Sequence, residues 1–320
     1  MRVAAVSDLG TLVRVSRLYY ELGETQEAIA HLVGVTRPQV SRLLKEARAQ
    51  GVVEIRIVDQ GEPGSEAGDA LRELFKLRAV HLAPTVDGPA ELTRRRVGRL
   101  AGHVLREALR DGMVVGVGDG AALAATADAM EPGPQLDVSV VPLCGGFWRP
   151  TAGADPARRI ADALGASAYA LHAPGLLDEP AVRAALLAHP GVRSVTELWG
   201  RLDAAILGIG GPTWSEATVG PRAMAELAAA GAVGEVLIAP FDIHGRLVGD
   251  QLRERTIAFD PRGLPGVATT IGVAEGETKV APILGALRGR FVNVLVTDVA
   301  TAEAVAALAD GKTLVSGRPA

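Results

Sequence analysis

Beyond residue 68, short apolar runs alternate with longer stretches in which apolar residues recur every three to four positions. The apolar runs have the length and composition of strands, and they are Met113–Val117, Val138–Leu143, Ala168–Leu171, Ala204–Ile209, Val236–Phe241, Val267–Val273 and Val292–Thr297. The amphipathic stretches predict helices and include Leu92–Leu109, Ala121–Met130, Ala157–Leu164, Pro180–Leu187, Arg222–Ala230 and Val280–Leu287. This alternation predicts an α/β fold with a mainly parallel sheet covered on both faces.

The first sixty residues follow helical periodicity instead. Thr25 is expected to cap a short helix over residues 25–32, in which three apolar residues share one face: Ala28, Ile29 and Leu32. Gly34 is able to adopt the positive φ of a tight turn, and Thr36 is expected to cap a second helix that runs to about Ala49. The spacing predicts a helix-turn-helix.

Compositional breaks divide the chain into two domains. Residues 1–59 form the predicted helix-turn-helix domain, closed by a strand over Val52–Val58, whose alternate residues would pack inward. Residues 60–68, rich in glycine and acidic residues with one proline, are expected to be a linker. Residues 69–320 form the predicted α/β domain.

The second short helix has one apolar and one cationic face. Its inward stripe is Val40, Leu43, Leu44 and Ala47. Between residues 31 and 51 the chain contains four Arg or Lys residues and one acidic residue. Such a helix fits the major groove of DNA, where its first residues meet base edges. We expect base contacts from Arg37, Gln39 and Arg42, phosphate contacts from Thr25, Gln26 and Lys45, and further DNA contacts from Thr36 and Ser41. A merely solvated face is the alternative.

The composition limits the remaining chemistry. The chain is 48% hydrophobic, 22% charged and carries a net charge of −4, which argues against nonspecific coating of nucleic acid but allows a local DNA-binding face. The single cysteine, Cys144, excludes a disulfide framework within the chain, and six scattered histidines lack the spacing of a metal site. No metal and no cofactor is expected. Without a long apolar run or a signal peptide, the chain is expected in the cytoplasm, with no membrane partner.

Glycine-rich turns follow several predicted strands, where ligands bind in open α/β sheets. They contain Gly118-Asp119-Gly120, Gly145-Gly146, Gly208-Ile209-Gly210-Gly211, and Glu275 through Lys279. Their spacing matches neither a dinucleotide fingerprint nor a Walker A motif. We expect them to share one pocket, although turns after strands also carry glycine for backbone reasons alone.

Several segments together resemble the SorC family (DeoR-like) of sugar-responsive transcriptional regulators: Leu18-Tyr19-Tyr20, Thr25-Gln26, Ile29-Ala30, Val40 through Leu44, Ala47-Arg48 and Gly51 through Val53. The resemblance extends through nearly the whole chain. It implies a C-terminal sugar-binding domain similar in fold to phosphosugar isomerases. It also implies a homo-oligomer, either a dimer or, more often, a tetramer. A sugar, polyol or sugar phosphate would alter the affinity of this oligomer for operator DNA, as in a repressor.

The resemblance also indicates effector-binding residues. It implies that Lys279 meets a phosphate or sugar hydroxyls and that Asp242 accepts hydrogen bonds from hydroxyls; a solvated lysine and a turn-forming aspartate are the alternatives. The chain departs from the family where Ala122 replaces a hydroxyl residue and Glu275 replaces a small one. Alanine cannot donate to a phosphate, and a carboxylate would repel it. We therefore hypothesise an effector that is unphosphorylated, or whose phosphate is held differently.

An enzyme is the second hypothesis, because a fold does not determine a function. A phosphosugar isomerase or deaminase with an added N-terminal helical module would share the α/β domain. Such an enzyme needs a positioned acid and base, and the loops show only the close pair Asp242 and His244. We therefore expect a regulator and no catalytic residues. The basic run from Arg94 to Arg99 is expected to be a solvated face or an oligomer contact.

Overall fold

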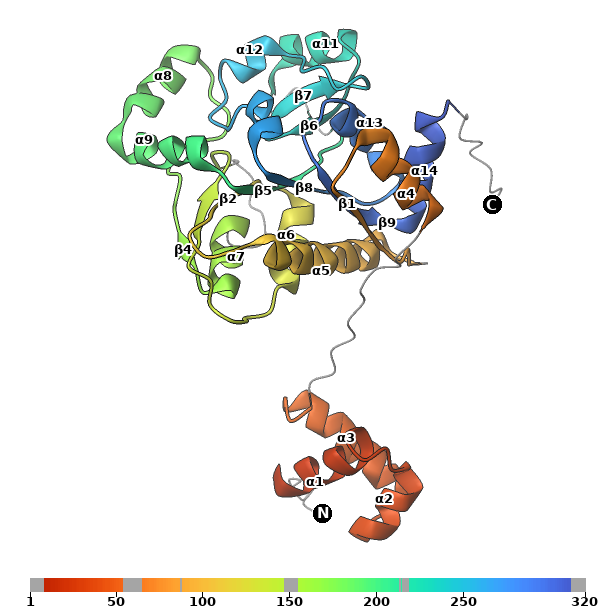
Figure 1. The fold of residues 1–320 in the computed structure, drawn as a ribbon. Helices are drawn as coiled ribbons and strands as arrows, with labels where there is room; N and C mark the ends of the chain where they lie inside the picture. The colour runs from red at the N-terminus through yellow and green to blue at the C-terminus, as the bar shows by residue number, and fades with distance from the viewer. Residues whose placement is uncertain are drawn as a thin grey trace. The chain divides into compact units, whose positions relative to one another are not determined.

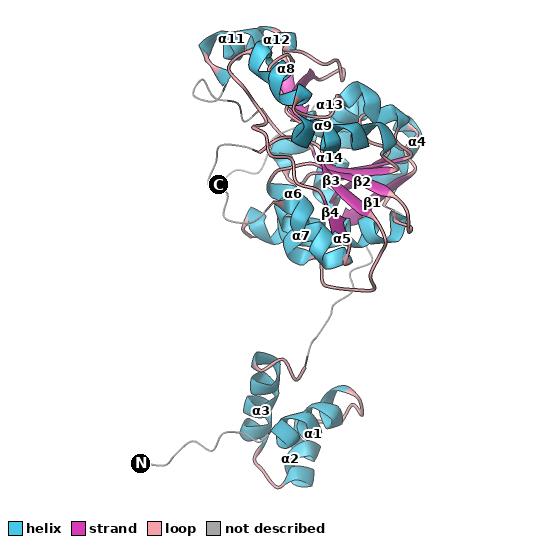
Figure 2. Cartoon of the chain, turned by 90° about the vertical axis from the view of Figure 1, so that its left-hand side faces the viewer, coloured by secondary structure: helices cyan, strands magenta, loops and turns pink. Residues whose placement is uncertain are grey.

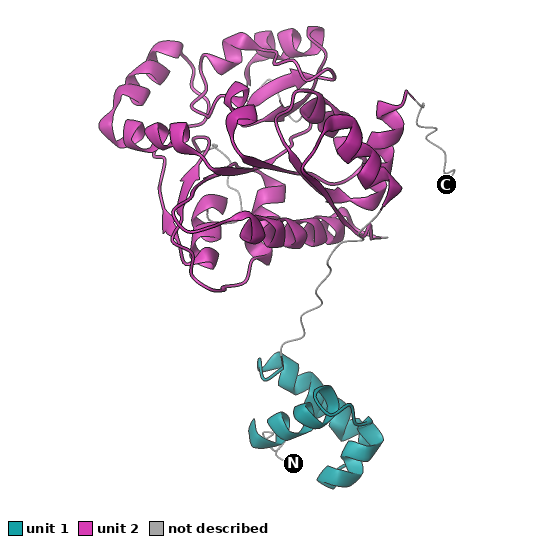
Figure 3. Cartoon of the chain, viewed as in Figure 1, with its two compact units in different colours: residues 1–58 teal, residues 59–320 magenta. Residues whose placement is uncertain are grey.

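The computed structural model describes residues 9–53, 65–86, 88–146, 155–212, 214 and 219–311. Two compact units make up the chain, residues 1–58 and residues 59–320 (Figure 3). Each unit has its own apolar core.

Three helices form the first unit: α1 (Leu9–Tyr20), α2 (Gln26–Val33) and α3 (Arg37–Ala49) (Figure 1). Their buried core consists of Leu12, Val15, Ile29, Ala30, Val40, Leu44 and Ala47. Gly34 ends α2 with φ 74°, the left-handed conformation that glycine adopts without strain.

Leu32 lies largely outside the core of this unit. Its side chain is 56% exposed, so of the three residues expected to share one face of α2, only Ile29 is fully buried. The eight-residue α2 buries only the narrow stripe of Ile29 and Ala30. The strand predicted over Val52–Val58 lies mostly outside the described residues, and its first two residues follow α3 without strand conformation.

A seven-stranded parallel sheet forms the centre of the second unit, in the order β1-β9-β8-β5-β2-β3-β4. The strands are β1 (Ala79–Ala83), β2 (Val114–Val117), β3 (Ser139–Pro142), β4 (Ser167–Ala168), β5 (Ala204–Gly208), β8 (Thr269–Val273) and β9 (Val294–Asp298). The expected parallel α/β fold is confirmed. The pattern missed β1, an edge strand interrupted by His81.

Helices cover both faces of this sheet (Figure 2). On one face lie α5 (Ala90–Ala108), α6 (Ala121–Ala129) and α7 (Pro156–Leu164); α4 (Glu66–Phe75), α13 (Val280–Arg288) and α14 (Val299–Ala309) cover the other. Successive strand residues supply the two cores in turn: Ile206 packs toward α5, whereas Ala205 and Leu207 pack toward α13. Burial on both faces explains why the strands appear as uninterrupted apolar runs.

The predicted strand Val236–Phe241 is wrong. Its residues divide between β6 (Ala232–Val236) and β7 (Ala239–Asp242), an antiparallel hairpin outside the main sheet. Leu237 and Ile238 reverse the chain with φ 51° and 64°. Two-residue hairpin turns of this type usually contain Asn or Gly, so the sequence carried no turn signal here.

The predicted linker is also too long. Helix α4 begins at Glu66, so the last three of residues 60–68 are helical, and residues 60–64 lie outside the described part. Gly68 is buried, and a Cβ placed there would lie 3.2 Å from Cδ1 of Leu82. This glycine therefore permits close packing of the helix on β1 and does not mark a linker.

The remaining elements connect the layers. They are α8 (Pro180–Ala188), α9 (Pro190–Thr196), η1 (Glu197–Arg201), α11 (Pro221–Ala229), α12 (Asp250–Arg253), η2 (Pro261–Gly266) and η3 (Glu277–Lys279). From β2 the chain winds outward through β3 and β4; from β5 it winds the other way through β8 and β9. The reversal lies between β2 and β5, and in open α/β sheets ligands bind beside the carboxyl ends of strands at such a point.

Candidate functional site

Helix α3 presents the residues expected to contact DNA on its exposed side. Arg37, Ser41, Arg42 and Lys45 are all exposed, whereas Val40, Leu44 and Ala47 on the opposite side are buried. Apolar packing therefore fixes which face of the helix points outward. That face carries three cations within nine residues.

Three of the residues expected to contact DNA have structural partners. The side-chain oxygen of Gln39 accepts from the backbone N–H of Thr36 at 2.8 Å and from its hydroxyl at 2.9 Å, which caps α3. The hydroxyl of Thr25 accepts from the N–H of Ala28 at 3.2 Å and caps α2. Gln26, the first residue of α2, is half-buried. Of these polar groups, the Gln39 amide nitrogen has no partner among the described residues.

In the second unit, the loop after β2 lies directly at the reversal point. The N–H of Gly118 donates to the carbonyl of Ile206 in β5, and a Cβ at Gly118 would come within 3.3 Å of both Leu207 and Leu237. Asp119 follows, and its carboxylate accepts from the N–H of Gly120 at 2.7 Å. Gly120, with φ 124°, begins α6. The close approach of β5 and of the β6–β7 hairpin therefore explains why residue 118 is a glycine.

The loop after β3 lies near Asp119. Burial raises the pKa of the Cys144 thiol, and the charges of Asp119, Asp155 and Glu235 all act on it and raise its pKa further. Cys144 therefore stays protonated and is no nucleophile. A Cβ at Gly145 would lie 2.5 Å from the carbonyl oxygen of Ala173, whereas Gly146 is open.

Asp242 has a structural role. Its carboxylate accepts from the N–H groups of His244 and Arg246, both at 2.9 Å, and pairs with the Arg246 guanidinium at 3.2 Å. These contacts close the turn after β7. The carboxylate therefore has turn partners of its own, as the turn-forming alternative expects.

Glu275 and Lys279 flank the turn between β8 and α13. The Glu275 side chain is 8% exposed and accepts from Nε of Arg94 at 2.7 Å, across 181 positions of sequence. Burial raises the pKa of Glu275 despite this partner. The basic run from Arg94 to Arg99 was expected to be either a solvated face or an oligomer contact. Because Arg94 pairs with a buried carboxylate, it is not a merely solvated residue.

The ammonium of Lys279 has no such partner. Burial lowers its pKa, while the carboxylates of Glu275 and Glu235 oppose that shift. Among the described residues we find no hydrogen bond or ion pair of this ammonium. Lys279 is thus a half-buried cation whose donors are available to a ligand.

Glu235 and Trp214 were missed in the sequence. Glu235 lies on β6 and accepts from the indole N–H of Trp214 at 2.8 Å, and its backbone pairs with Gly210 in the turn after β5. Burial raises the pKa of Glu235. A signal existed, because Glu235 is the one carboxylate in the apolar stretch 232–241. The predicted strand Val236–Phe241 begins one residue after Glu235 and therefore leaves it out.

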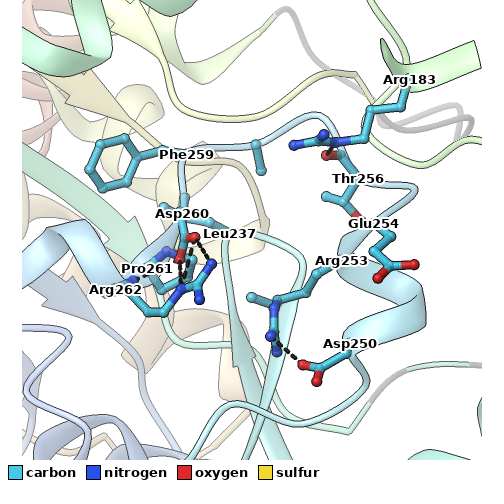
Figure 4. Close-up of a pocket in the computed structure, with 12 residues that line it drawn as sticks. Arg183, Leu237, Asp250, Arg253, Glu254, Thr256, Phe259, Asp260, Pro261 and Arg262 are labelled. Carbon is cyan, nitrogen blue, oxygen red and sulfur yellow. Dashed lines mark hydrogen bonds and ion pairs between the residues drawn. The ribbon is translucent and has the colours of Figure 1, made fainter. Parts of the chain in front are cut away.

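A separate hollow of about 310 Å³ opens between α8, α12 and η2 (Figure 4). Most of its charged groups have partners: Arg253 pairs with Asp250 and Arg262 with Asp260, while Arg183 donates to the carbonyl of Thr256. None of the expected effector residues lines it. Among the described residues, Lys279 and one oxygen of Glu235 have no partner near the sheet reversal, which makes the carboxyl edge of the sheet the candidate for a ligand site.

The described residues contain neither a metal-binding cluster nor a membrane-spanning helix. No group of three or more His, Cys, Asp or Glu side chains could hold a metal ion there. None of the described helices is both long and apolar enough to cross a membrane.

Comparison with known proteins covers both units. Residues 62–307 match the family "Putative sugar-binding domain", and residues 9–60 match the Crp-like helix-turn-helix domain. The sorbitol operon regulator of Klebsiella pneumoniae is 29% identical over 92% of this chain and 97% of its own. The transcriptional regulator LsrR of the same species is 31% identical over 95% of both chains.

Solved structures agree with these matches. The crystal structure of the full-length sorbitol operon regulator SorC from Klebsiella pneumoniae superposes with a TM-score of 0.78 at 29% identity. The match covers 94% of this chain and 99% of that one. The similarity therefore extends over the helical unit and the α/β unit together.

Proposed function

The chain belongs to the SorC family of sugar-binding transcriptional regulators, and from this we propose that it binds operator DNA and that a sugar, polyol or sugar phosphate controls this binding. The observation that carries the proposal is the match to named regulators over both units, with an exposed cationic face on α3. Helix α3 enters the major groove, where Arg37 and Arg42 meet base edges and Lys45 meets a phosphate.

The effector binds at the carboxyl edge of the sheet. Its site comprises the loops Gly118-Asp119-Gly120 and Gly145-Gly146 together with Glu235, Glu275 and Lys279. Support comes from the reversal between β2 and β5 and from the unpaired ammonium of Lys279. Asp242 is left out of this set because its carboxylate closes a turn.

The regulator acts as a homo-oligomer, a dimer or tetramer. A two-fold assembly places two copies of α3 on two half-sites of one operator. The effector changes operator affinity by binding one arrangement of the assembly better than another. Sedimentation of the full chain, with and without effector, tests the assembly.

The regulator is not expected to act as an enzyme. Glu235 and Lys279 have shifted pKa values, and taken by themselves such groups would be compatible with acid-base catalysis. The named relatives, however, are regulators. A gel-shift assay with the DNA upstream of the protein's own gene tests the proposal, with a panel of sugars and sugar phosphates added. We expect a specific shift that one panel member alters; isomerase turnover without any DNA binding would contradict it.

A further inference from the structure

The region around Lys279 holds more carboxylates than cations. Glu235 and Glu275 both act on the Lys279 ammonium, and Arg94 is the second cation nearby. Asp298 adds a third carboxylate that acts on Glu275. With three carboxylates and two cations, this region has no excess of positive charge.

The cation that would most readily hold a phosphate is already engaged. Arg94 gives its Nε to Glu275 at 2.7 Å and a terminal nitrogen to Glu91 at 3.2 Å. A phosphate could bind the edge of this guanidinium that includes Nε only by displacing the almost fully buried Glu275, and it could bind the edge formed by the two terminal nitrogens only in competition with Glu91. Removing one partner of a buried ion pair leaves the other charge uncompensated, which is costly.

The carboxylates themselves are suited to hydroxyl groups. One oxygen of Glu235 accepts from Trp214, and among the described residues its other oxygen has no donor. An ionised carboxylate can only accept hydrogen bonds, while the Lys279 ammonium can only donate them. A polyhydroxyl compound satisfies both groups, since each hydroxyl donates and accepts.

A phosphate monoester cannot do the same. It carries a charge of roughly −1.5 to −2 at neutral pH and offers mainly acceptor oxygens. It would compete with Glu235 and Glu275 for the same two cations, and both carboxylates would repel it.

We infer that Glu275, held by Arg94, makes this site reject phosphate and select an uncharged polyhydroxyl effector, such as a free sugar or a sugar alcohol. The inference rests on the proposed effector site at the carboxyl edge of the sheet. It assigns Glu275 as the residue that sets specificity and Arg94 as the residue that positions it.

Inorganic phosphate and glycerol 3-phosphate are the probes, titrated calorimetrically into the full chain at constant ionic strength. Glu275→Gln removes the charge and keeps the shape of the side chain. Glu91→Gln is the matched control, because it removes the exposed second partner of the same arginine. We expect negligible phosphate binding by the wild type and by Glu91→Gln. Glu275→Gln should bind both probes at least about tenfold more tightly, because a nearby repulsive charge is gone.

Each other result overturns the inference. Phosphate binding by the wild type as tight as by Glu275→Gln would show that the carboxylate does not repel it. An equal gain in both variants would assign the effect to the released arginine, and no gain in a folded Glu275→Gln would remove Glu275 from specificity. Thermal melting establishes folding of each variant. The proposed regulatory function is tested separately by the gel shift, so its failure is distinguishable from failure here.

Discussion

At the scale of single residues, some polar groups near the candidate site have hydrogen-bond partners within the protein, and others have none among the described residues. Asp242 closes a turn, and Asp298 accepts from Thr85 and Thr301 at the start of α14. Lys279 and one oxygen of Glu235 have no described partner. A half-buried charged group without a partner costs stability, and such groups are expected where a ligand supplies the missing contacts.

The charge on Glu235 should make stability depend on pH. Because its folded-state pKa is raised by burial, the stability associated with its proton is fully present below the ordinary value near 4.5 and is lost as pH rises through the folded-state value. Glu235→Gln resembles the protonated form and can still accept from Trp214. Its melting temperature should therefore rise above that of the wild type as pH increases from 4.5 to 8.

Circular dichroism melts at several pH values measure this difference. Glu277→Gln, at an exposed position in η3 just before α13, is the control and should follow the wild type at every pH. A difference between Glu235→Gln and the wild type that stays constant over this range would contradict the assignment.

Arg42 tests the DNA-binding face. If Arg42 contacts a base edge, Arg42→Ala should weaken operator binding by about 1–3 kcal/mol and relax sequence preference at one position. Fluorescence anisotropy with operator and scrambled DNA measures both effects. Lys45→Ala is the comparison, since loss of a phosphate contact weakens binding to all sequences and lowers the salt slope by about 1. Equal losses on both DNAs for Arg42→Ala would assign it to the backbone.

At the scale of elements, glycines set how closely the layers approach. A Cβ at Gly98 of α5 would lie 2.7 Å from the backbone carbonyl of Ala125 in α6. Gly98→Ala should force the two helices apart and destabilise the second unit by about 1–3 kcal/mol. Gly200→Ala, in η1 with nothing within 4 Å, should change stability little.

Tryptophan fluorescence during urea unfolding measures this effect selectively, because all three tryptophans follow residue 59. A midpoint for Gly98→Ala that matches the midpoint for Gly200→Ala would show that α5 and α6 accommodate the methyl group.

The β6–β7 hairpin is the element on which the candidate site depends most. Leu237 and Ile238 hold positive φ values that cost about 1–3 kcal/mol each, and both are buried, which offsets part of that cost. The turn brings Glu235 beside Gly210 and Leu237 beside Gly118. The hairpin thus supplies a carboxylate to a site that is otherwise built from loops of the main sheet.

At the scale of the whole molecule, DNA binding and effector binding are assigned to different units. Lys279→Ala should leave operator affinity of the ligand-free protein unchanged and blunt its response to effector. Arg42→Ala should do the reverse and keep effector affinity. Gel shifts across an effector titration, with calorimetry on the same samples, compare the two variants. Loss of both properties in either variant would indicate misfolding instead of a site-specific effect.

The sequence by itself determined the local features. Helical and strand periodicity, capping residues and glycine turns depend on neighbours within a few positions, so they predicted the helix-turn-helix, most strands and the parallel α/β class. The resemblance to SorC regulators added the function. The turn at Leu237 and Ile238 was not predicted, because neither leucine nor isoleucine usually occurs in a tight turn.

Only the tertiary structure decided which distant groups meet. The order of the strands placed the reversal between β2 and β5. It also brought Arg94 to Glu275 and, through the hairpin, Glu235 to Trp214 and Lys279. Periodicity reports which face of an element is buried, but an ion pair depends on the elements that lie beside it. The charge balance of the candidate effector site was therefore decided by strand order and by the hairpin, and not by any local pattern.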